Sequence, residues 1–371
     1  MDRYASRLAL HLRSIATDLE ILLACQIAPL TLDPDGIPRA HRASGPLPVP
    51  ILPVEGAQEL RRYYDRYYRY PRRVRGIPAD VLHVLDHSYA HILESRRHRR
   101  RIVTVHDLFP VLTVQSGARS WKERLRNHLL GRVLAALRRA DAWIVATEWM
   151  RQELAQWLGR DDPRLHVIPY GVDDAFFEPA FESRSATRAR WRVPEKAFVL
   201  LHVGSVGPRK NLPTVIAATD ALRRAGLDAW LVQLGGTLTP EQAADIEARG
   251  LQTHVRALGE ANEAELRAGY RASDVLLFPS HYEGFGFPVL EAMASELPVV
   301  TSGAGGLAEV AGDAALVVGG REVGPYVTAV RRVATNAQWR QQLVTRGLVR
   351  ARQFRWIETA RRTAEVYRAL S

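Results

Sequence analysis

The sequence is poor in cysteine and contains no long apolar segment. Its single cysteine, Cys25, excludes a disulfide framework and is expected to be a small buried core residue. No apolar run reaches the roughly 18 residues that a membrane-spanning helix needs. The first residues, MDRYASRLALHLRS, have a basic amphipathic pattern without the uninterrupted apolar region of a signal peptide. Together these absences predict a cytoplasmic protein.

Two common phosphate-binding motifs are also missing. The sequence has no GxxxxGK(S/T) loop, and no GxGxxG follows a strand with an acidic residue downstream, so neither a P-loop nor a dinucleotide-binding fingerprint is indicated. One group of metal-ligating residue types is present, formed by Asp86, His87, His91 and Asp107. Its spacing fits no standard zinc or calcium pattern, and we therefore predict no metal site.

The positive charge of the chain is concentrated in one region. The 371 residues carry a formal net charge of +11, and residues 61–139 hold 19 Lys and Arg against 6 Asp and Glu. Within this region arginines alternate with tyrosines in RRYYDRYYRYPRRVR at 61–75. Basic residues interleaved with aromatic residues are typical of contact with nucleic-acid phosphates or lipid headgroups. The alternative is a solvated face of an arginine-rich protein.

Apolar strand patterns alternate with helical patterns in both halves of the chain. In the first half we expect strands within 79–93, 101–110, 141–147 and 164–174, with helices at 118–140 and 148–159. In the second half we expect strands at 198–204, 228–236, 253–259, SDVLLFPS, PVVTSG and AALVVG. Such alternation predicts parallel sheets with right-handed crossovers. The length suits two domains, which we place at 1–178 and 179–353, followed by an amphipathic helix over 354–371.

Three turns of the second half carry glycines and polar residues directly after a predicted strand. They are GSVGPRKN at 204–211, HYEGFGFP at 281–288 and TSGAGGLAE at 301–309. Because the carboxyl ends of parallel strands meet at one edge of a sheet, these turns can converge on one ligand. Arg209 and Lys210 lie beside glycines, a combination that suits a diphosphate, since the side chains are cationic and glycine lets backbone N–H groups approach.

The second of these turns leads into a helix without a capping side chain. Pro288 suits the first helical turn, but no Ser, Thr, Asp or Asn precedes it, so the N–H groups from Gly284 to Phe287 favour an anion or a polar ligand. Glu283 and Glu291 flank this point with seven residues between them, and both can face a pocket at the strand end. The alternative is a pair of surface acids.

Several segments closely resemble the retaining, nucleotide-sugar-dependent glycosyltransferases of family 4, which have the GT-B fold. They are VIPYGVDD, HVGSVGPRKNL, GEANEAELRAGYRASDVLLFPS, YEGFGFPVLEAMASELPVVTS and AEVAGDAAL, and the likeness covers nearly the whole chain. The resemblance implies two Rossmann-like doubly wound α/β domains facing across a cleft. The first would bind the acceptor and the second the nucleotide sugar, and the last helix would return to the first domain.

The resemblance also implies a role for each site residue. Glu283 would bind hydroxyls of the transferred sugar and Glu291 those of the ribose, while His106, in VHDLFP, would lie near the transferred sugar. The remaining donor-binding residues would be Arg209 and Lys210 at the leaving diphosphate, with Gly204, Ser205, Gly284, Phe285, Gly286 and Phe287. Fixed cations and N–H groups can stabilise the departing diphosphate without a metal or cofactor. Retention would follow from departure and attack on the same face, with a diphosphate oxygen as base.

The resemblance leads to a specific functional expectation. We expect transfer of a hexose or deoxyhexose, with GDP-mannose as the favoured donor, to a polysaccharide or to a lipid-diphosphate-linked acceptor. The basic region 61–139 would hold the protein against the anionic inner face of the cell membrane, and no nucleic acid is expected as a partner.

Two alternatives differ from this expectation in kind. A nucleic-acid-binding protein would explain the charge but would leave the three turns and the carboxylate pair without a purpose. A GT-B relative with another reaction is opposed by two features. The Glu-seven-Glu spacing argues against an epimerase, and no lysine context suggests the pyridoxal cofactor of a phosphorylase.

The start of the sequence departs from the family pattern. Family members begin with a strand and a glycine-rich loop, whereas MDRYASRLALHL resembles the sequence that follows that loop. We expect the true start to lie about one strand and one loop upstream of Met1. Upstream codons in the same frame without an apolar run and a Gly-Gly pair would contradict this expectation.

Overall fold

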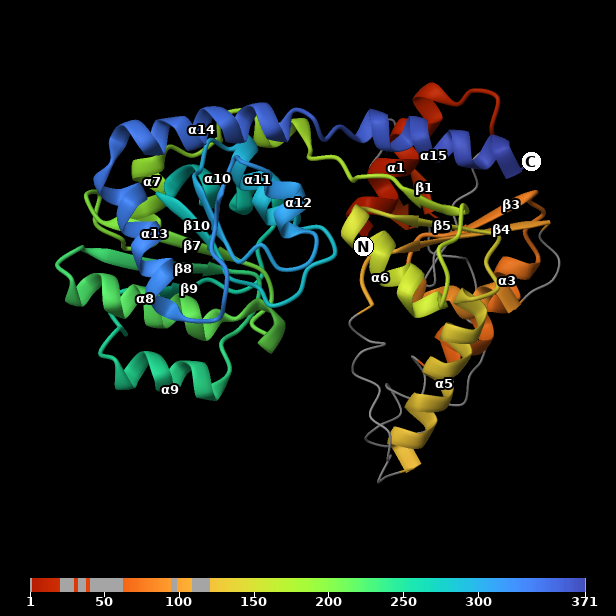
Figure 1. Ribbon diagram of the computed structural model, residues 1–371, viewed down its shortest axis with the longest axis horizontal. Helices are drawn as coiled ribbons and strands as arrows, with labels where there is room; N and C mark the ends of the chain where they lie inside the picture. The colour runs from red at the N-terminus through yellow and green to blue at the C-terminus, as the bar shows by residue number, and fades with distance from the viewer. Residues whose placement is uncertain are drawn as a thin grey trace. The chain divides into compact units, whose positions relative to one another are not determined.

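The computed structural model describes residues 2–20, 30–32, 38–40, 63–94, 99–108 and 121–370 (Figure 1). Cys25 and residues 61–62, 95–98 and 109–120 of the basic region lie outside these described residues. The chain divides into two compact units. The N-unit comprises Met1–Ala146, Arg151–Gly171 and Trp356–Ser371, and the C-unit comprises Thr147–Met150 and Val172–Arg355.

The N-unit contains a four-stranded parallel sheet in the order β3-β4-β5-β6. Its strands are β3 (Val81–Val84), β4 (Arg100–Val105), β5 (Ala142–Val145) and β6 (Leu165–Val167). The connections that a parallel sheet requires are made by η2 (His87–Glu94), α5 (Trp121–Leu137) and α6 (Glu148–Leu158). A separate antiparallel pair is formed by β1 (Leu30–Leu32) and β2 (Pro38–Ala40), and η1 (Asp65–Arg69) with α3 (Tyr70–Arg75) precedes β3.

The first and last helices of the chain pack together in the N-unit. These are α1 (Asp2–Ile15) and α15 (Trp356–Leu370), and Arg368 of α15 donates two hydrogen bonds to Asp18, at 2.8 and 2.7 Å. A buried polar chain ties both helices to the sheet. Its links are Tyr4 to Thr104 (3.2 Å), Thr104 to His83 (2.8 Å) and His83 to Tyr367 (2.6 Å).

The C-unit contains a six-stranded parallel sheet in the order β12-β11-β10-β7-β8-β9. Its strands are β7 (Phe198–Val203), β8 (Ala229–Leu234), β9 (Val255–Ala257), β10 (Val275–Phe278), β11 (Val299–Thr301) and β12 (Leu316–Val317). The four central strands are buried along their whole length. Burial on both faces explains why they are nearly continuous apolar runs in the sequence.

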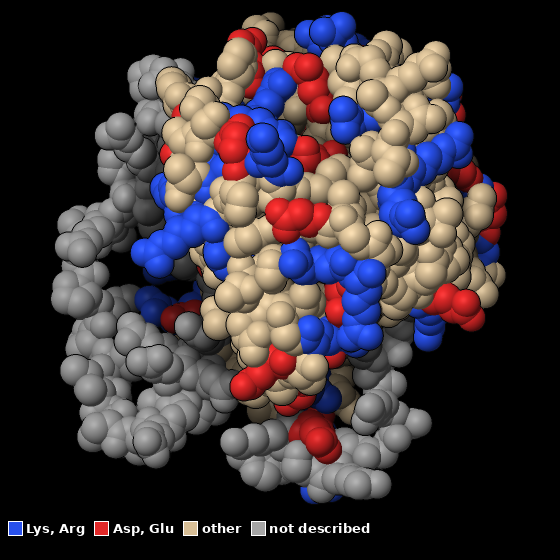
Figure 2. Space-filling view, turned by 90° about the vertical axis from the view of Figure 1, so that its left-hand side faces the viewer, with Lys and Arg blue, Asp and Glu red and all other residues tan. Residues whose placement is uncertain are grey.

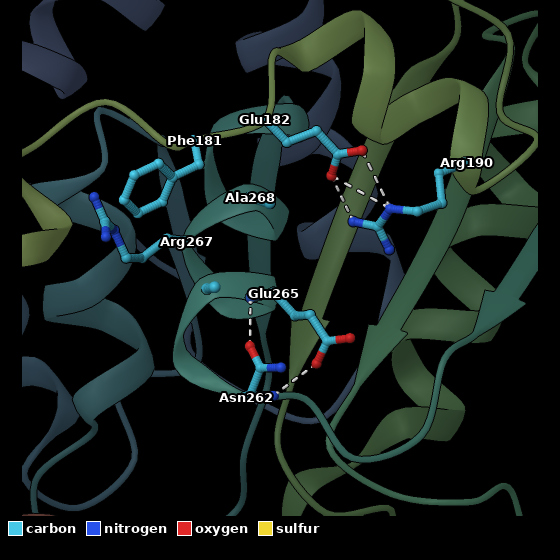
Figure 3. A pocket seen from close by; sticks show the side chains of 8 residues that line it. Phe181, Glu182, Arg190, Asn262, Glu265, Arg267 and Ala268 are labelled. Atoms are coloured by element: carbon cyan, nitrogen blue, oxygen red, sulfur yellow. Dashed lines mark hydrogen bonds and ion pairs between the residues drawn. The ribbon is translucent and has the colours of Figure 1, made fainter.

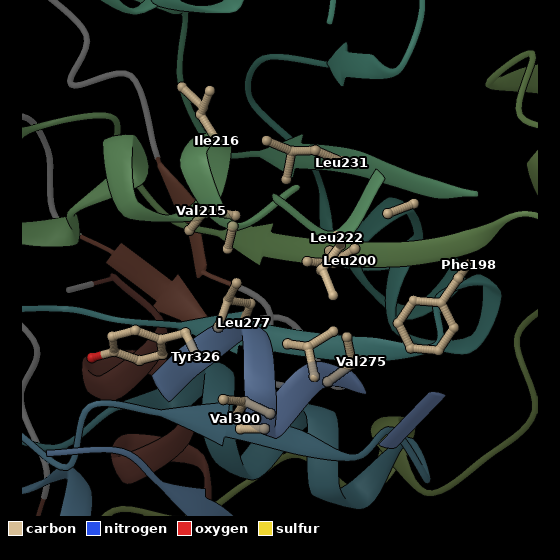
Figure 4. Packing of buried hydrophobic residues seen from close by; sticks show 14 of the residues in the cluster. Phe198, Leu200, Val215, Ile216, Leu222, Leu231, Val275, Leu277, Val300 and Tyr326 are labelled. Carbon is tan, nitrogen blue, oxygen red and sulfur yellow. The ribbon is translucent and has the colours of Figure 1, made fainter. Parts of the chain in front are cut away.

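Helices cover both faces of this sheet. They are α7 (Arg184–Arg190), α8 (Leu212–Arg224), α9 (Pro240–Ala248), α10 (Glu263–Ala272), α11 (Phe287–Ala294), α12 (Leu307–Ala311), α13 (Val323–Thr335) and α14 (Ala337–Ala351), with short turns η3 (Asp174–Phe176) and η4 (Pro208–Lys210). Figure 4 shows the core on one face, where Leu200, Leu231 and Leu277 of the strands meet Leu222 of α8 and Tyr326 of α13. The predicted class, α/β with two parallel sheets, is therefore confirmed.

One expected strand is shorter than its pattern suggested. The apolar pattern predicted a strand over 164–174, but β6 ends at Val167. Pro169 cannot donate to a ladder, and Gly171 lies so close to the start of α15 that a Cβ there would be 2.2 Å from the Trp356 backbone nitrogen. The chain therefore leaves the sheet early to pass beside α15.

Candidate functional site

The C-unit sheet has a switch point between β7 and β10. The chain runs from β7 outward to β8 and β9, and then returns to β10 on the other side of β7. In open α/β sheets, ligands bind outside the carboxyl ends of the strands at such a point. The turns 204–211 and 281–288 follow these two strands, and the turn after β11 lies next to them. The topology thus places all three turns at one edge.

Glycines pack the second and third turns directly against each other. Gly305 has a φ of +66°, and a Cβ there would lie 2.3 Å from the Glu283 carbonyl oxygen. Gly306 donates its N–H to the same oxygen at 2.8 Å, and a Cβ on Gly306 would lie 2.5 Å from the carbonyl oxygen of Gly284. This close approach holds Glu283 in place through its backbone.

Helix α11 begins without a capping side chain, as the sequence predicted. Gly286 is its N-cap residue, with a φ of 102°, and it provides no side-chain cap hydrogen bond. Pro288 lies in that turn. The backbone of the preceding turn is held elsewhere, because the Thr147 hydroxyl donates to the carbonyl oxygen of Gly284 at 3.0 Å. An uncapped helix start next to a rigid turn is suited to a polar or anionic ligand.

Lys210 and Glu283 form a buried ion pair at this edge. The Lys210 Nζ lies 2.6 Å from Glu283 Oε1, and the two residues are only 8% and 6% exposed. The ammonium also lies 4.8 Å from the centre of the Phe278 ring. Gly204, with a φ of +134°, packs on the lysine side chain, since a Cβ there would lie 3.1 Å from Lys210 Cε. Three of the predicted site residues are therefore brought together.

Arg209 and Asn211 connect the first turn to the second. The Arg209 carbonyl accepts a hydrogen bond from the His281 backbone N–H at 2.8 Å. Asn211 before Pro213 is typical of a helix N-cap, and Asn211 is the N-cap residue of α8, but its φ of 54° is left-handed and its side chain makes no cap hydrogen bond. Instead its amide donates to the Pro279 carbonyl oxygen at 3.0 Å and its Oδ1 accepts from Thr214. Asn211 therefore links the turn 204–211 to the chain just before the turn 281–288.

Glu291 lies in α11 and is 3% exposed. The hydroxyl group of Tyr270, on α10, donates a hydrogen bond to Glu291 Oε2 at 2.8 Å. Tyr270 was not among the predicted site residues. Its spacing from Glu291 carries no signal, because the contact depends on how α10 and α11 pack.

A buried histidine lies beneath the first turn. His202 of β7 is fully buried, and its Nε2 lies 3.4 Å from the Lys210 carbonyl oxygen. Burial lowers the pKa of His202 to about 4, so the imidazole is neutral at pH 7. Gln233 donates to the Gly204 carbonyl oxygen at 3.1 Å. These polar side chains, which sequence reasoning missed, hold the turn that carries Lys210.

His106 follows β4 in the N-unit, and both of its ring nitrogens have partners. Its Nε2 lies 2.8 Å from the Leu85 carbonyl oxygen and its Nδ1 lies 2.6 Å from the Tyr170 hydroxyl. Since a carbonyl oxygen only accepts, Nε2 carries the hydrogen and Tyr170 donates to Nδ1. Burial lowers the pKa of His106 to about 4, which keeps the ring neutral at pH 7.

The neighbouring His87 differs from His106. It is 7% exposed, and neither ring nitrogen has a hydrogen-bond partner among the residues the structure describes, the nearest charged group being Asp86 at 3.6 Å. Within the same described part of the chain, no three His, Cys, Asp or Glu side chains are arranged to hold a metal ion. The cluster noted in the sequence is therefore not assembled into a metal-binding geometry.

A shallow pocket lies away from these turns. Figure 3 shows it between α7 and the first turns of α10, with the Glu182–Arg190 ion pair on one side, and it contains none of the predicted site residues. On the face drawn in Figure 2, basic and acidic side chains are interspersed. In the described ranges, no helix combines the length and the apolar character needed to cross a membrane.

Several solved structures share this architecture. Sucrose-phosphate synthase from Thermosynechococcus elongatus superimposes with a TM-score of 0.67 at 23% identity, covering 92% of this chain and 85% of that protein. HepE from Anabaena, solved in complex with UDP-glucose, gives a TM-score of 0.66 at 19% identity, covering 78% of this chain and 79% of that protein. The two parallel sheets together with these matches define a GT-B fold.

Family comparisons cover both halves of the chain. The family described as "Glycosyltransferase Family 4" matches residues 1–176, and the family described as "Glycosyl transferases group 1" matches residues 183–348. The chain therefore belongs to the group 1, family 4 glycosyltransferases.

Curated relatives share the same family. The D-inositol 3-phosphate glycosyltransferase of Kineococcus radiotolerans is 37% identical over 251 residues, covering 62% of this chain and 57% of the relative. The enzyme of the same name from Streptosporangium roseum is 33% identical over 240 residues, covering 62% of this chain and 55% of the relative. The chain thus spans less than two thirds of the length of these relatives.

Proposed function

We propose that the protein transfers a hexose from a nucleoside diphosphate sugar to a hydroxyl acceptor with retention of configuration. The observation that carries this proposal is the buried Lys210–Glu283 pair among glycine-packed turns at the switch point of the C-unit sheet. Membership in the glycosyltransferase family supports it. A cation beside a carboxylate matches a donor that has a diphosphate next to a hydroxyl-rich ring.

The site residues have complementary roles in this proposal. Lys210 and Arg209 stabilise the negative charge that the diphosphate accumulates as the bond to the sugar breaks. Glu283 accepts hydrogen bonds from sugar hydroxyls, and Glu291 accepts them from the ribose. The backbone N–H groups around Gly286, at the uncapped start of α11, add polar contacts to the donor. Gly204 and Ser205 border the same site.

Both ring nitrogens of His106 are already hydrogen-bonded, which argues against a role as a general base. We propose that it lies near the transferred sugar, as the resemblance implies. Burial keeps the ring neutral, and its hydrogen bonds to Leu85 and Tyr170 fix its orientation. A hydrogen bond from the ring to a sugar hydroxyl would replace one of these two, so His106 serves in positioning rather than in proton removal.

For both the donor and the acceptor we propose a favoured candidate and a second one to test. We propose a hexose donor, with GDP-mannose favoured from the sequence, and UDP-glucose is a second candidate because HepE was solved with it. For the acceptor we propose a polysaccharide or a lipid-diphosphate-linked sugar. The names of the curated relatives make inositol phosphate an acceptor to test beside it.

A thermal-shift screen of GDP, UDP, dTDP and ADP sugars tests the donor proposal. One nucleotide is expected to raise the melting temperature by several degrees at a concentration well above its Kd. Glu291→Ala removes the proposed ribose contact and is expected to weaken binding by about 10- to 100-fold, as for hydrogen bonds to a charged group. Its matched control is Glu247→Ala, an exposed glutamate on α9, which should keep the full shift. The donor proposal fails if none of the sugars changes the melting temperature.

We also propose that the N-unit docks on an anionic membrane surface through the segment 63–75. Tyr64 and Tyr68 are 51% and 49% exposed, and the arginines of α3 that face solvent are Arg72, Arg73 and Arg75. Exposed tyrosines beside arginines suit the lipid headgroup region. Each basic residue near an anionic membrane surface contributes about 1 kcal/mol to the free energy of membrane binding.

Flotation with vesicles containing anionic lipid tests this docking. The wild type is expected to float with the vesicles at low salt and to dissociate as salt is raised. The triple change Arg72→Glu, Arg73→Glu and Arg75→Glu should abolish flotation. The same number of exposed arginines changed to glutamate in the C-unit, at Arg321, Arg331 and Arg352, should reduce flotation far less. Equal losses in the two triple variants would show that only net charge matters.

A further inference from the structure

A buried tyrosine contacts the carboxylate that we assign to the ribose. Tyr270 on α10 is fully buried, and Glu291 on α11 is 3% exposed. The Tyr270 hydroxyl donates to Glu291 Oε2 at 2.8 Å. The bond joins two helices, and its two residues are 21 positions apart in the sequence. It connects α10 to a predicted site residue of α11.

The position of the tyrosine ring is set by packing. The ring meets Phe176 edge to face, with centroids 5.8 Å apart and planes at 72°. Ser295, just past α11, donates to the Phe176 carbonyl oxygen at 3.2 Å, so the same phenylalanine is tied to the end of α11. Ser273 closes the end of α10 by donating to the Gly269 carbonyl oxygen. With its ring confined, the hydroxyl of Tyr270 is held at a defined point.

A buried glutamate benefits from such a donor in two ways. An ionised carboxylate is costly to bury unless hydrogen bonds compensate it. A glutamate side chain also has several rotatable bonds, and holding it in one orientation before a ligand arrives reduces the entropy lost on binding. A hydroxyl that donates to Oε2 provides both effects.

We propose that Tyr270 is a positioning residue for Glu291 and thereby determines the affinity of the site for nucleotides that carry a ribose diol. This inference rests on the proposed function, because it assumes that Glu291 binds the ribose. In this proposal Tyr270 affects nucleotide binding through the carboxylate of Glu291. Its contribution should therefore disappear whenever the ligand lacks the hydroxyls or the protein lacks Glu291.

The test compares nucleotide binding in Tyr270→Phe and wild-type protein by isothermal titration. The probes are UDP and GDP with their 2′,3′-dideoxy counterparts. Loss of the hydroxyl is expected to weaken the ribonucleotide that binds by about tenfold, the size of one hydrogen bond to a charged group, and to leave the dideoxy nucleotide unchanged. The matched control is Tyr326→Phe, which removes another buried tyrosine hydroxyl of the C-unit, 3.5 Å from the Gly320 carbonyl oxygen. It should leave both affinities unchanged.

A double variant separates positioning from general stability. Adding Tyr270→Phe to Glu291→Ala should weaken binding no further than Glu291→Ala alone. The inference is overturned if Tyr270→Phe has no effect, or weakens ribo- and dideoxynucleotides equally, while Glu291→Ala weakens the ribonucleotide. If Glu291→Ala itself leaves the affinity unchanged, the ribose role in the proposed function is wrong, and the inference falls with it.

Discussion

Replacing Lys210 with alanine is expected to lower the rate of sugar transfer by about 100- to 1,000-fold, the usual cost of removing one group that stabilises a developing charge. Lys210 is buried, and its Nζ forms an ion pair with Glu283 Oε1 at 2.6 Å. Without it, the departing diphosphate loses a fixed positive charge. The measurement is nucleoside diphosphate release, followed under single-turnover conditions with the donor that the thermal-shift screen identifies.

The same substitution should also reduce stability, and the two effects can be separated. Removing Lys210 leaves the Glu283 carboxylate buried without its partner, which typically costs about 3–5 kcal/mol. Urea unfolding of Lys210→Ala should show this loss, and combining Lys210→Met with Glu283→Gln should recover much of the stability while activity stays low. Lys196→Ala, an exposed lysine of the C-unit, is the matched control and should behave as wild type. A Lys210→Ala protein that is folded and transfers sugar at the wild-type rate would refute the assignment.

Much of this site could be predicted from the sequence because its signals are local. The apolar run SDVLLFPS predicted a buried strand, and Pro288 after two glycines, without a preceding cap residue, predicted the uncapped helix start that the structure shows. Parallel topology then required the turns after β7, β10 and β11 to share one edge. Each of these inferences depends on residues within about ten positions of one another.

The remaining features depend on contacts between distant elements. Tyr270 meets Glu291 only because the fold brings these positions of α10 and α11 together, and His106 is held by Leu85 and Tyr170 from two other segments. The partners of the Asn211 side chain could not be predicted for a related reason. Its position before Pro213 is typical of a cap, but its bond to Pro279 requires β7 and β10 to be neighbours. Sequence spacing contains none of this information.

A second large effect is expected at Gly305, where alanine should lower the free energy of unfolding by about 3–5 kcal/mol and abolish donor binding. Two costs combine at this position. The φ of +66° disfavours any residue with a Cβ by about 1–2 kcal/mol, and the added Cβ would lie 2.3 Å from the Glu283 carbonyl oxygen. Because that oxygen belongs to backbone, the clash can be relieved only by moving one of the two turns apart from the other, which displaces Gly305 from the turn that carries Glu283. Urea unfolding and nucleotide titration measure the two consequences.

Gly320→Ala separates the clash from the backbone strain. Gly320 also has a positive φ, of +87°, but nothing lies within 4 Å of the Cβ that alanine would add. Its expected cost is therefore the conformational one alone, about 1–2 kcal/mol, with unchanged donor affinity. Equal effects of the two substitutions would mean that the close approach of Gly305 to Glu283 does not shape the site. A larger loss of both stability and binding at Gly305 would mean that this backbone contact holds Glu283 where the donor needs it.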